Sequence, residues 1–303
     1  MSTPRSLRIP SQVKQHVIET SRGNFAALSA QAPGGASDRK PALLVPGYTG
    51  SKEDFLSILE PLATAGRAVA AIDMRGQYQS APATNHDGYA LDELAGDLLT
   101  LAGTLAGESR SVHLLGHSFG GLVARQATIA SPGAFASVTL LCSGPGTIGG
   151  ERAKTLRELL DFLEPAGTDV TLLGSKIDEV WNSQLKPQAL ADGTPPEIID
   201  FLAERAAFSC PLGLAEMARH LLNCPDRTAE LAALEQLPKL VSYGENDDAW
   251  PPDVQDMMAK RLGAERICIP AAAHSPAVEA PETTAAMLTA FWNQAESVQP
   301  PHP

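Results

Sequence analysis

Apolar and polar residues form distinct blocks along the chain, and the longest apolar blocks lie in its first half. Each of these blocks ends at a turn signal, and together they cover residues 42–47, 68–73, 112–118 and 138–143. Uninterrupted apolar runs of this length are typical of strands that are buried on both faces of a sheet. The segments between them repeat apolar residues every three or four positions, as amphipathic helices do. The pattern predicts an α/β fold with a mostly parallel central sheet and helices on both faces.

Residues 14–30 have a different period. Polar and apolar residues alternate there on both sides of Ser21-Arg22-Gly23. Alternation of this kind predicts half-buried strands, and the glycine allows a positive φ in a tight turn between them. We therefore expect a β-hairpin that adds an antiparallel edge to the sheet.

The alternation of strands and helices stops near Gly146 and resumes with apolar runs at 238–245 and 265–270, followed by a final helix that is expected to end near Gln294. The interval between contains only helical patterns, broken by Gly and Pro. Such an interval predicts a helical cap inserted into the α/β fold. The expected division of the chain is a core of residues 1–146 and 237–296, a helical cap of residues 147–236 and a flexible tail of residues 297–303.

The composition predicts a folded protein and argues against nucleic acid and anionic lipid surfaces as partners. The chain has 303 residues, of which 44% are hydrophobic and 19% charged, and its formal net charge is −12. A strongly negative chain without a basic cluster repels nucleic acid and anionic lipid surfaces. We find no apolar signal-peptide segment and no run of about 18 apolar residues that would span a membrane. These features predict a cytoplasmic protein without nucleic-acid partners.

The cysteines indicate neither a metal centre nor a redox motif. They form no C-x-x-C pair, and no histidine follows them at metal-ligand spacing; their positions are Cys142, Cys210, Cys224 and Cys268. Buried free thiols are the simplest interpretation. We therefore expect no metal and no organic cofactor.

A serine stands between two glycines at the end of a predicted strand, in the segment His113–Gly121, HLLGHSFGG. A strand that turns at once into a helix passes through a tight corner, where side chains two residues before and after the serine would collide. The corner would expose the Ser118 hydroxyl. A hydroxyl becomes a nucleophile only when a base takes its proton and an acid orients that base.

A candidate base and candidate acids follow the last two predicted strands. His274 follows one of them, and Asp247 and Asp248 follow the other. Ligand sites of open α/β sheets form at the carboxyl ends of the strands, so these side chains are expected to lie near Ser118. Asp73 also ends a predicted strand, but its Asp-Met-Arg-Gly context suggests a structural pair with Arg75.

Backbone donors for a negatively charged intermediate are expected beside the serine. The glycine-rich turn after the first apolar run contains Tyr48, ahead of a helix predicted to begin near Lys52. The N–H groups of Tyr48 and of Phe119, the residue after the serine, would together hold an oxyanion.

Several motifs resemble those of the α/β-hydrolase superfamily, and they extend from Ala42 to the final helix. They read PGYTG, DMRGQYQS, GHSFGG, YGENDD and AAHSPAVEAPE. The resemblance implies a catalytic triad of Ser118, Asp247 and His274, with Tyr48 supplying one oxyanion amide. In that family the acid lies three residues after the glycine of the turn, so Asp247 is preferred to Asp248. Asp248 would then be solvated or cap the helix that begins near Pro251. A serine at the corner is unlike the aspartate of haloalkane dehalogenases and epoxide hydrolases.

The expected function is therefore a serine hydrolase that forms an acyl-enzyme at Ser118. The apolar cap favours a small or medium hydrophobic ester, a thioester or a lactone as substrate. The same triad would serve an acyltransferase, a C–C bond hydrolase or a cofactor-free perhydrolase. A small-molecule-binding protein with a vestigial triad is a further alternative. The other histidines are expected to be structural or solvated; they are His16, His86, His113, His117, His220 and His302.

Overall fold

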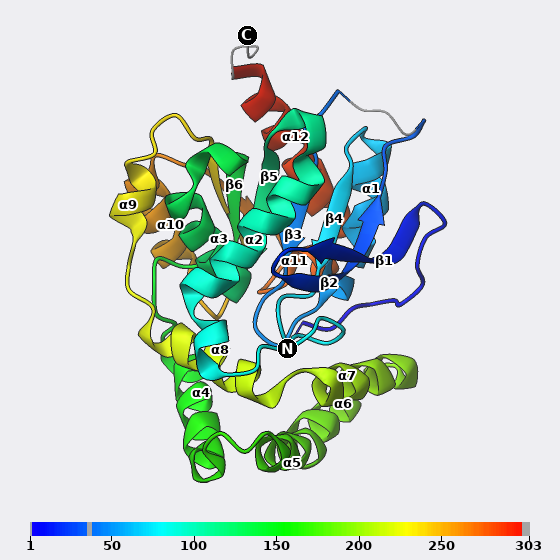
Figure 1. The fold of residues 1–303 in the computed structure, drawn as a ribbon, viewed down its shortest axis with the longest axis vertical. Helices are drawn as coiled ribbons and strands as arrows, with labels where there is room; N and C mark the ends of the chain where they lie inside the picture. Colours follow the sequence, from blue (N-terminus) through cyan, green and yellow to red (C-terminus); the bar gives the residue numbers. More distant parts are fainter. Residues whose placement is uncertain (1, 35–37, 299–303) are drawn as a thin grey trace.

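One sheet of eight strands runs through the computed structural model, which describes residues 2–34 and 38–298 (Figure 1). Its order is β1-β2-β4-β3-β5-β6-β7-β8, and the pairs β1–β2 and β2–β4 are antiparallel while the others are parallel. The strands are β1 Val13–Thr20, β2 Gly23–Ala30, β3 Ala42–Val45, β4 Val69–Ile72, β5 Val112–His117, β6 Phe135–Leu141, β7 Lys239–Gly244 and β8 Glu265–Ile269. The predicted parallel sheet and its antiparallel hairpin edge are both confirmed.

Burial explains why these strands could be recognised. Every residue of β3, β4, β5, β6 and β7 is buried, as expected for strands covered on both faces. The outer strand β8 is mostly exposed along its length, because nothing pairs with its far edge among the described residues. In the hairpin, Gly23 has φ 136°, the positive value expected for its turn.

Helices cover both faces of the sheet (Figure 1). The helices α2 and α3 pack together on one face, and α1 and α12 pack together on the other. The core helices are α1 Leu56–Thr64, α2 Leu91–Ala106, α3 Phe119–Ala130, α10 Pro252–Leu262, α11 Pro276–Glu279 and α12 Pro281–Val298, with short 3₁₀ turns η1 Lys52–Phe55, η2 His86–Tyr89, η3 Gly107–Ser109 and η4 Pro132–Ala134. The predicted α/β architecture is therefore confirmed.

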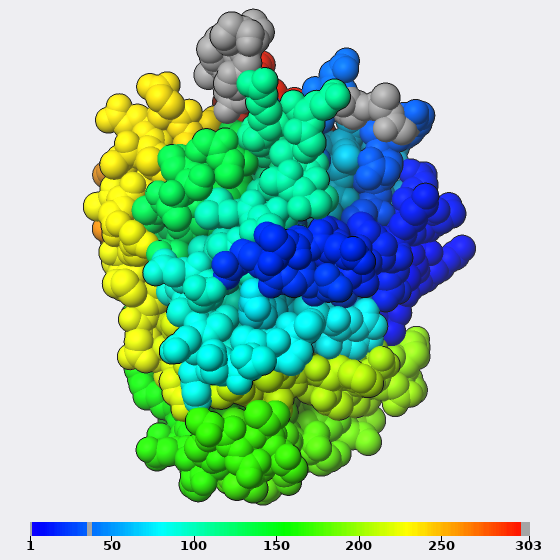
Figure 2. Space-filling model, in the orientation of Figure 1, coloured from blue at the N-terminus to red at the C-terminus, as the bar shows by residue number. Residues whose placement is uncertain are grey.

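The chain between β6 and β7 is helical. Its elements are α4 Gly150–Leu163, the 3₁₀ turn η5 Glu164–Ala166, α5 Val170–Val180, the π-helical turn η6 Trp181–Leu185, α6 Lys186–Ala191, α7 Pro196–Phe208, α8 Pro211–Asn223 and α9 Thr228–Ala232. The helices α4 to α7 gather at one end of the molecule, which Figure 2 shows as a continuous green layer. The short helix α9 instead contacts the core helices α3 and α10. We call α4 to α8 the helical insertion; that residues 147–236 act as a separate cap stays a prediction.

The end of the chain differs from its expected form. Helix α12 continues to Val298, so residues 297 and 298 of the predicted tail are helical, and residues 299–303 lie outside the described part of the chain. The last turn is anchored by Glu296, whose carboxylate binds Arg67 at 2.6 Å and His113 of β5 at 3.0 Å. These contacts extend the ordered helix beyond its apolar repeat.

The predicted pair of Asp73 and Arg75 is absent. Asp73 instead accepts hydrogen bonds from the backbone and the ammonium group of the buried Lys52, at 2.8 and 2.9 Å. Arg75 turns the other way and binds Asp97 of α2, with 2.7 Å between its Nε and Oδ2. The pair was predicted because Asp73 and Arg75 are close in the sequence, but after the end of β4 their side chains point in different directions.

Of the helices in residues 2–34 and 38–298, none combines the length and the apolarity that crossing a membrane requires.

Candidate active site

Ser118 lies at a sharp corner between β5 and α3. The strand ends at His117 and the helix begins at Phe119, so Ser118 alone makes the turn, with φ 53° and ψ −119°. A Cβ atom on Gly116 would overlap the carbonyl group of Gly120, and a Cβ atom on Gly120 would overlap the carbonyl oxygen of Pro46. Only glycine fits at these two positions, as the steric argument from the sequence requires.

The structure brings Ser118, His274 and Asp247 together. The Ser118 hydroxyl lies 2.9 Å from Nε2 of His274, and Nδ1 of the same ring lies 2.8 Å from Oδ1 of Asp247. Asp247 follows β7 and His274 follows β8, so three strands of the sheet each deliver one side chain. A carboxylate only accepts hydrogen bonds, so Nδ1 carries the proton and Nε2 is free to accept one from the serine.

Asp247 is buried, and its negative charge is stabilised by several donors. Its carboxylate accepts hydrogen bonds from the Ala249 amide at 3.0 Å and from Gln255 of α10 at 2.8 Å, in addition to His274. Burial alone would raise the pKa of this carboxyl, but His274 and the other donors outweigh burial and hold the pKa below its usual value. Asp247 is therefore ionised at neutral pH. No motif in the sequence pointed to Gln255.

Asp248 has a different environment. Its side chain is 65% exposed and forms a two-pronged ion pair with Arg152 of α4, at 2.6 and 3.0 Å. It does not cap α10, where Pro251 occupies the N-cap position. Of the two adjacent aspartates, only Asp247 contacts the imidazole of His274.

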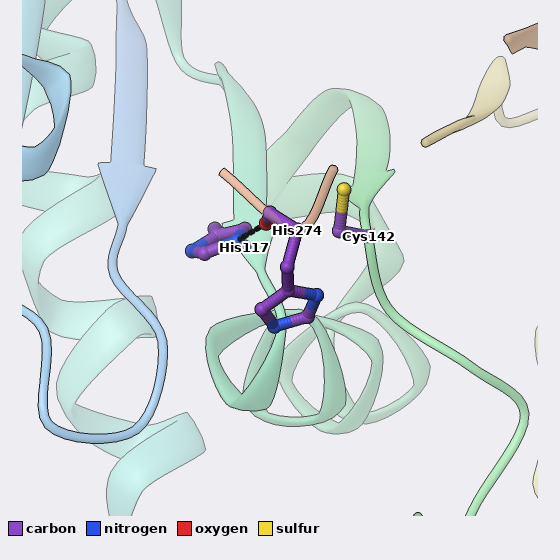
Figure 3. Close-up of side chains that lie close together, drawn as sticks. All are labelled: His117, Cys142 and His274. Carbon is purple, nitrogen blue, oxygen red and sulfur yellow. Dashed lines mark hydrogen bonds between the residues drawn. The ribbon is translucent and has the colours of Figure 1, made fainter. Parts of the chain in front are cut away.

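His117 joins the serine corner to the loop that carries His274 (Figure 3). Its Nε2–H donates to the backbone carbonyl oxygen of His274 at 2.6 Å, and the centroids of the two imidazole rings lie 5.1 Å apart. Burial lowers the pKa of His117 to about 3, so its ring is neutral at physiological pH. The hydrogen bond therefore persists over the pH range in which most hydrolases are assayed.

The ligand atoms of His117, Cys142 and His274 lie within 4.8 Å of one another, which raises the question of a metal site. Both ring nitrogens of His274 are already engaged by Ser118 and Asp247, and Nε2 of His117 binds a carbonyl oxygen. Burial and the nearby Asp247 raise the pKa of the Cys142 thiol well above its usual value, so it is not a thiolate. Figure 3 shows its sulfur pointing away from the His274 ring. The cluster is best explained as packing behind the triad.

The turn after β3 lies against the serine corner. A Cβ atom on Gly47 would lie 3.0 Å from Cβ of Ser118, which shows how closely the two backbones approach. Among the described residues, neither the Tyr48 amide nor the Phe119 amide donates a hydrogen bond to another group. Two backbone donors near the serine are therefore unpaired, and their role in holding an oxyanion stays a prediction.

A buried glutamine fixes the peptide group that carries the Tyr48 amide. The Nε2 group of Gln77 donates to the carbonyl oxygen of Gly47 at 2.8 Å, and its Oε1 accepts from the Met74 amide at 3.1 Å. In a trans peptide the C=O and the next N–H point in opposite directions. Holding the Gly47 carbonyl therefore also sets the direction of the Tyr48 N–H. No motif in the sequence pointed to this contact.

A cavity of about 530 Å³ lies in front of the triad, between the core and the helical insertion. Ser118 and His274 form part of its floor. Its apolar wall comes largely from the helical insertion, with Leu156, Leu159 and Phe162 of α4 and Val180, Leu185 and Leu221 farther along the chain. The ion pair of Arg152 and Asp248 lines the same cavity. A second ion pair, between the buried Arg205 of α7 and Asp54 at 2.9 Å, also ties the helical insertion to the core.

Besides His274, His117 also lines this cavity, whereas the other histidines that the structure describes do not. His86 pairs with Glu216 of α8 at 2.5 Å, and His220 binds the carbonyl oxygen of Tyr89 at 2.9 Å. His16 contacts Ser29 within the hairpin, and His113 contacts Ser137 and Glu296 inside the sheet. His302 lies outside the described residues.

Comparison with known proteins assigns the fold and the serine corner to a family. The model of the alpha/beta hydrolase family matches residues 42–287. The chain belongs to this family. The match includes every strand from β3 to β8 and all three residues of the hydrogen-bonded Ser118–His274–Asp247 chain. The resemblance stated from the sequence motifs is thereby confirmed.

Individual relatives of this α/β hydrolase have different names. RutD of Variovorax paradoxus (strain S110), provisionally named a carbamate hydrolase, is 36% identical over 107 residues, covering 35% of this chain and 39% of that protein. The dihydrolipoyllysine-residue acetyltransferase component of the acetoin cleaving system of Pseudomonas putida is 28% identical over 264 residues, covering 85% of this chain and 64% of that protein. The chain thus spans less than two thirds of the length of either relative.

Solved structures of other hydrolases have the same fold. The thermophilic esterase from Thermogutta terrifontis superimposes with a TM-score of 0.70 at 22% identity, covering 93% of this chain and 99% of that one. At this level of identity, the likeness establishes a shared architecture.

Proposed function

We propose that this α/β hydrolase is a serine esterase that cleaves a small or medium hydrophobic ester through an acyl-enzyme at Ser118. The observation that carries the proposal is the continuous chain of hydrogen bonds from the Ser118 hydroxyl through His274 to Asp247. Such a chain makes a serine hydroxyl nucleophilic at neutral pH. Thioesters and lactones have the same reacting carbonyl group and belong to the same substrate class.

In the proposed acylation step, Nε2 of His274 takes the proton of Ser118 as its oxygen attacks the ester carbonyl carbon. The carbonyl oxygen becomes an oxyanion, which the amides of Tyr48 and Phe119 stabilise. The protonated His274 then gives its proton to the leaving alcohol as the C–O bond breaks. In deacylation, His274 takes a proton from a water molecule as the water oxygen attacks the acyl carbon. The bond between the acyl carbon and the Ser118 oxygen then breaks, the carboxylic acid leaves, and His274 returns the proton to Ser118. No metal or organic cofactor takes part in the proposed steps.

Asp247 acts through the histidine in this scheme. Its carboxylate holds Nδ1 as the protonated nitrogen and stabilises the positive ring that forms in each transition state. The two further donors to Asp247, the Ala249 amide and the Gln255 side chain, help to keep its carboxylate ionised. Asp248, whose carboxylate forms an ion pair with Arg152, has no part in the proposed chemistry.

The cavity supports a small apolar substrate. Aliphatic and aromatic side chains of the helical insertion cover the site, and a volume of about 530 Å³ is within the range of small-molecule sites. The net charge of −12 disfavours nucleic acid as a partner. A cytoplasmic location belongs to the proposal and rests on the sequence alone.

Acyl transfer is the second candidate, because the relative from Pseudomonas putida is named as an acetyltransferase component. The acyl-enzyme would then pass its acyl group to an alcohol or thiol in place of water. Product analysis with a competing alcohol separates the two reactions. A binding protein with an inactive triad would retain the ligand without turnover, and C–C hydrolase or perhydrolase activity would appear as other products.

A panel of p-nitrophenyl esters tests the proposal. We expect hydrolysis by the wild-type protein and a fall in kcat of about 10⁴-fold in Ser118→Ala, His274→Ala and Asp247→Asn. Asp248→Asn is the matched control, because it changes the neighbouring carboxylate and should retain activity within about tenfold. Full activity in Ser118→Ala would refute the proposal, and full activity in Asp247→Asn would refute the choice of acid.

A further inference from the structure

A second, smaller cavity adjoins the main one. It has a volume of about 70 Å³ and lies between α4, α5, the π-helical turn η6 and α7. We call it the side pocket. Five residues line both cavities, and they are Tyr48, Thr49, Leu159, Val180 and Leu185.

The side pocket is lined mainly by apolar groups. The residues that line it but not the main cavity include Leu163, Ile177, Trp181, Ala206 and Leu214. Two polar members of its wall have partners of their own, because Nη1 of Arg205 pairs with Asp54 and the Ser209 hydroxyl donates to the Arg205 carbonyl oxygen at 2.8 Å. Neither His274 nor the Arg152–Asp248 pair lines it. Its chemistry suits a hydrocarbon group.

The backbone next to the side pocket has an unusual form. Helix α5 passes into α6 through a π-helical turn at Trp181–Leu185, and both ends of this turn line the side pocket. A π turn inserts an extra residue into a helix and is found frequently at functional sites. The two end residues of this turn, Trp181 and Leu185, are four positions apart and therefore lie on the same side of the helical segment, facing the side pocket.

From this geometry we infer that the side pocket binds the end of the substrate's acyl chain and sets its preferred length. The inference rests on the proposed esterase function. His274 must reach the leaving alcohol to protonate it, so the alcohol lies on the His274 side of the reacting carbon. The oxyanion faces the Tyr48 and Phe119 amides. We place the acyl chain along the wall that Tyr48 and Thr49 form, because these residues line both the main cavity and the side pocket.

Filling the side pocket from α7 tests this inference. In Ala206→Leu, the added methylene groups project from a residue that lines the pocket, whereas Ala207→Leu adds them at the next, exposed position of the same helix. Each methylene kept from water contributes about 0.8 kcal/mol, or roughly fourfold in kcat/KM. We expect Ala206→Leu to lower kcat/KM for the best long-chain p-nitrophenyl ester about tenfold or more and to leave the acetate within twofold. Ala207→Leu should retain the wild-type profile.

A variant that enlarges the side pocket and a series of esters that differ only in their alcohol complete the experiment. Trp181→Leu should move the optimum to longer acyl chains, and Leu163→Phe provides a second filling variant from α4 if Ala206→Leu does not fold. A series of alkyl acetates, which varies the alcohol, should give the same profile in all folded variants. Identical acyl-chain profiles in the pocket variants and Ala207→Leu would overturn the inference, as would a shift confined to the alkyl series. Absence of ester hydrolysis in the wild type would instead refute the proposed function itself.

Discussion

At the residue scale, the Tyr48 amide, the proposed oxyanion donor, belongs to a peptide group that is held by a side chain that does not touch Ser118, His274 or Asp247. Gln77 is 1% exposed and binds the carbonyl oxygen of Gly47, whose peptide group carries the Tyr48 N–H. The Gly50 amide donates to the same oxygen at 3.1 Å, so loss of the Gln77 contact removes one of the two hydrogen bonds that hold the direction of this peptide group. Preorganised donors of this kind contribute mostly to the transition state and little to substrate binding.

We therefore expect Gln77→Met, which keeps the length of the side chain but not its donor, to lower kcat about 10- to 100-fold with little change in KM. Gln77→Asn, a shorter donor, should recover part of the loss. Steady-state kinetics with one p-nitrophenyl ester measures both effects, and melting temperatures check that the variants are folded. A loss that appears only in KM would show that Gln77 acts on substrate binding.

The proximity of Ser118, Asp247 and His274 could be predicted from the sequence because each follows a strand and each stands in a recognisable motif. Asp247 and Asp248 were separable only by a family pattern, and the structure distinguishes them through their partners, His274 and Arg152. Gln77 and Gln255 could not be predicted. Their roles depend on which backbone group or carboxylate lies opposite them in the fold, and no local pattern encodes that.

At the scale of elements, the corner between β5 and α3 places strict steric limits on its glycines. A Cβ atom on Gly120 would overlap backbone atoms of Pro46 and Val45. Val45 is the last residue of β3, which pairs with β5, so this backbone cannot move away from the corner independently. Gly103, in the middle of α2, has no heavy atom within 4 Å of its Cβ position. The two residues therefore form a matched pair for the same substitution.

We expect Gly120→Ala to lower the free energy of unfolding by several kcal/mol or to prevent folding, because the overlap is with backbone and cannot relax cheaply. Gly103→Ala should raise it by about 0.5–1 kcal/mol, since alanine is the better helix former. Urea unfolding followed by circular dichroism measures both. Equal effects of the two substitutions would show that the corner is less crowded than described.

The elements themselves were predictable to different degrees. The strands β3, β4 and β5 stand out in the sequence because burial on both faces leaves uninterrupted apolar runs. The π-helical turn at Trp181–Leu185 left no such signal, because it changes the backbone by a single residue within a continuous helical pattern. The Asp73–Arg75 prediction failed for a related reason, since the true partner, Lys52, is distant in the sequence.

At the scale of the whole molecule, a buried cluster joins the middle of the sheet to the last turn of α12. His113 of β5 binds Glu296, which also binds Arg67 ahead of β4. Burial lowers the pKa of His113 to about 4, and Glu296, despite its own burial, has a pKa lowered to about 2 by His113 and Arg67. The cluster links segments from three parts of the chain, and its stability depends on pH.

The unfolded chain binds a proton at His113 near pH 6.5, whereas the folded protein does so only near pH 4. Between these values the unfolded state holds more protons, so the free energy of unfolding falls as the pH is lowered. From pH 7 to pH 5, His113 should contribute roughly 2 kcal/mol to this fall. Urea unfolding of wild type and His113→Gln at both pH values measures the contribution. If the variant loses as much stability as the wild type, His113 is not the titrating group.

The central claim is that Ser118 is a nucleophile activated within this fold, and covalent labelling tests it most directly. Reaction of the wild-type protein with a fluorophosphonate, followed by intact mass measurement and peptide mapping, should give one label per chain, located on Ser118. The label should be absent in Ser118→Ala and form far more slowly in His274→Ala. Ester hydrolysis by a wild-type protein that takes up no label at Ser118, or by Ser118→Ala at the wild-type rate, would contradict the account.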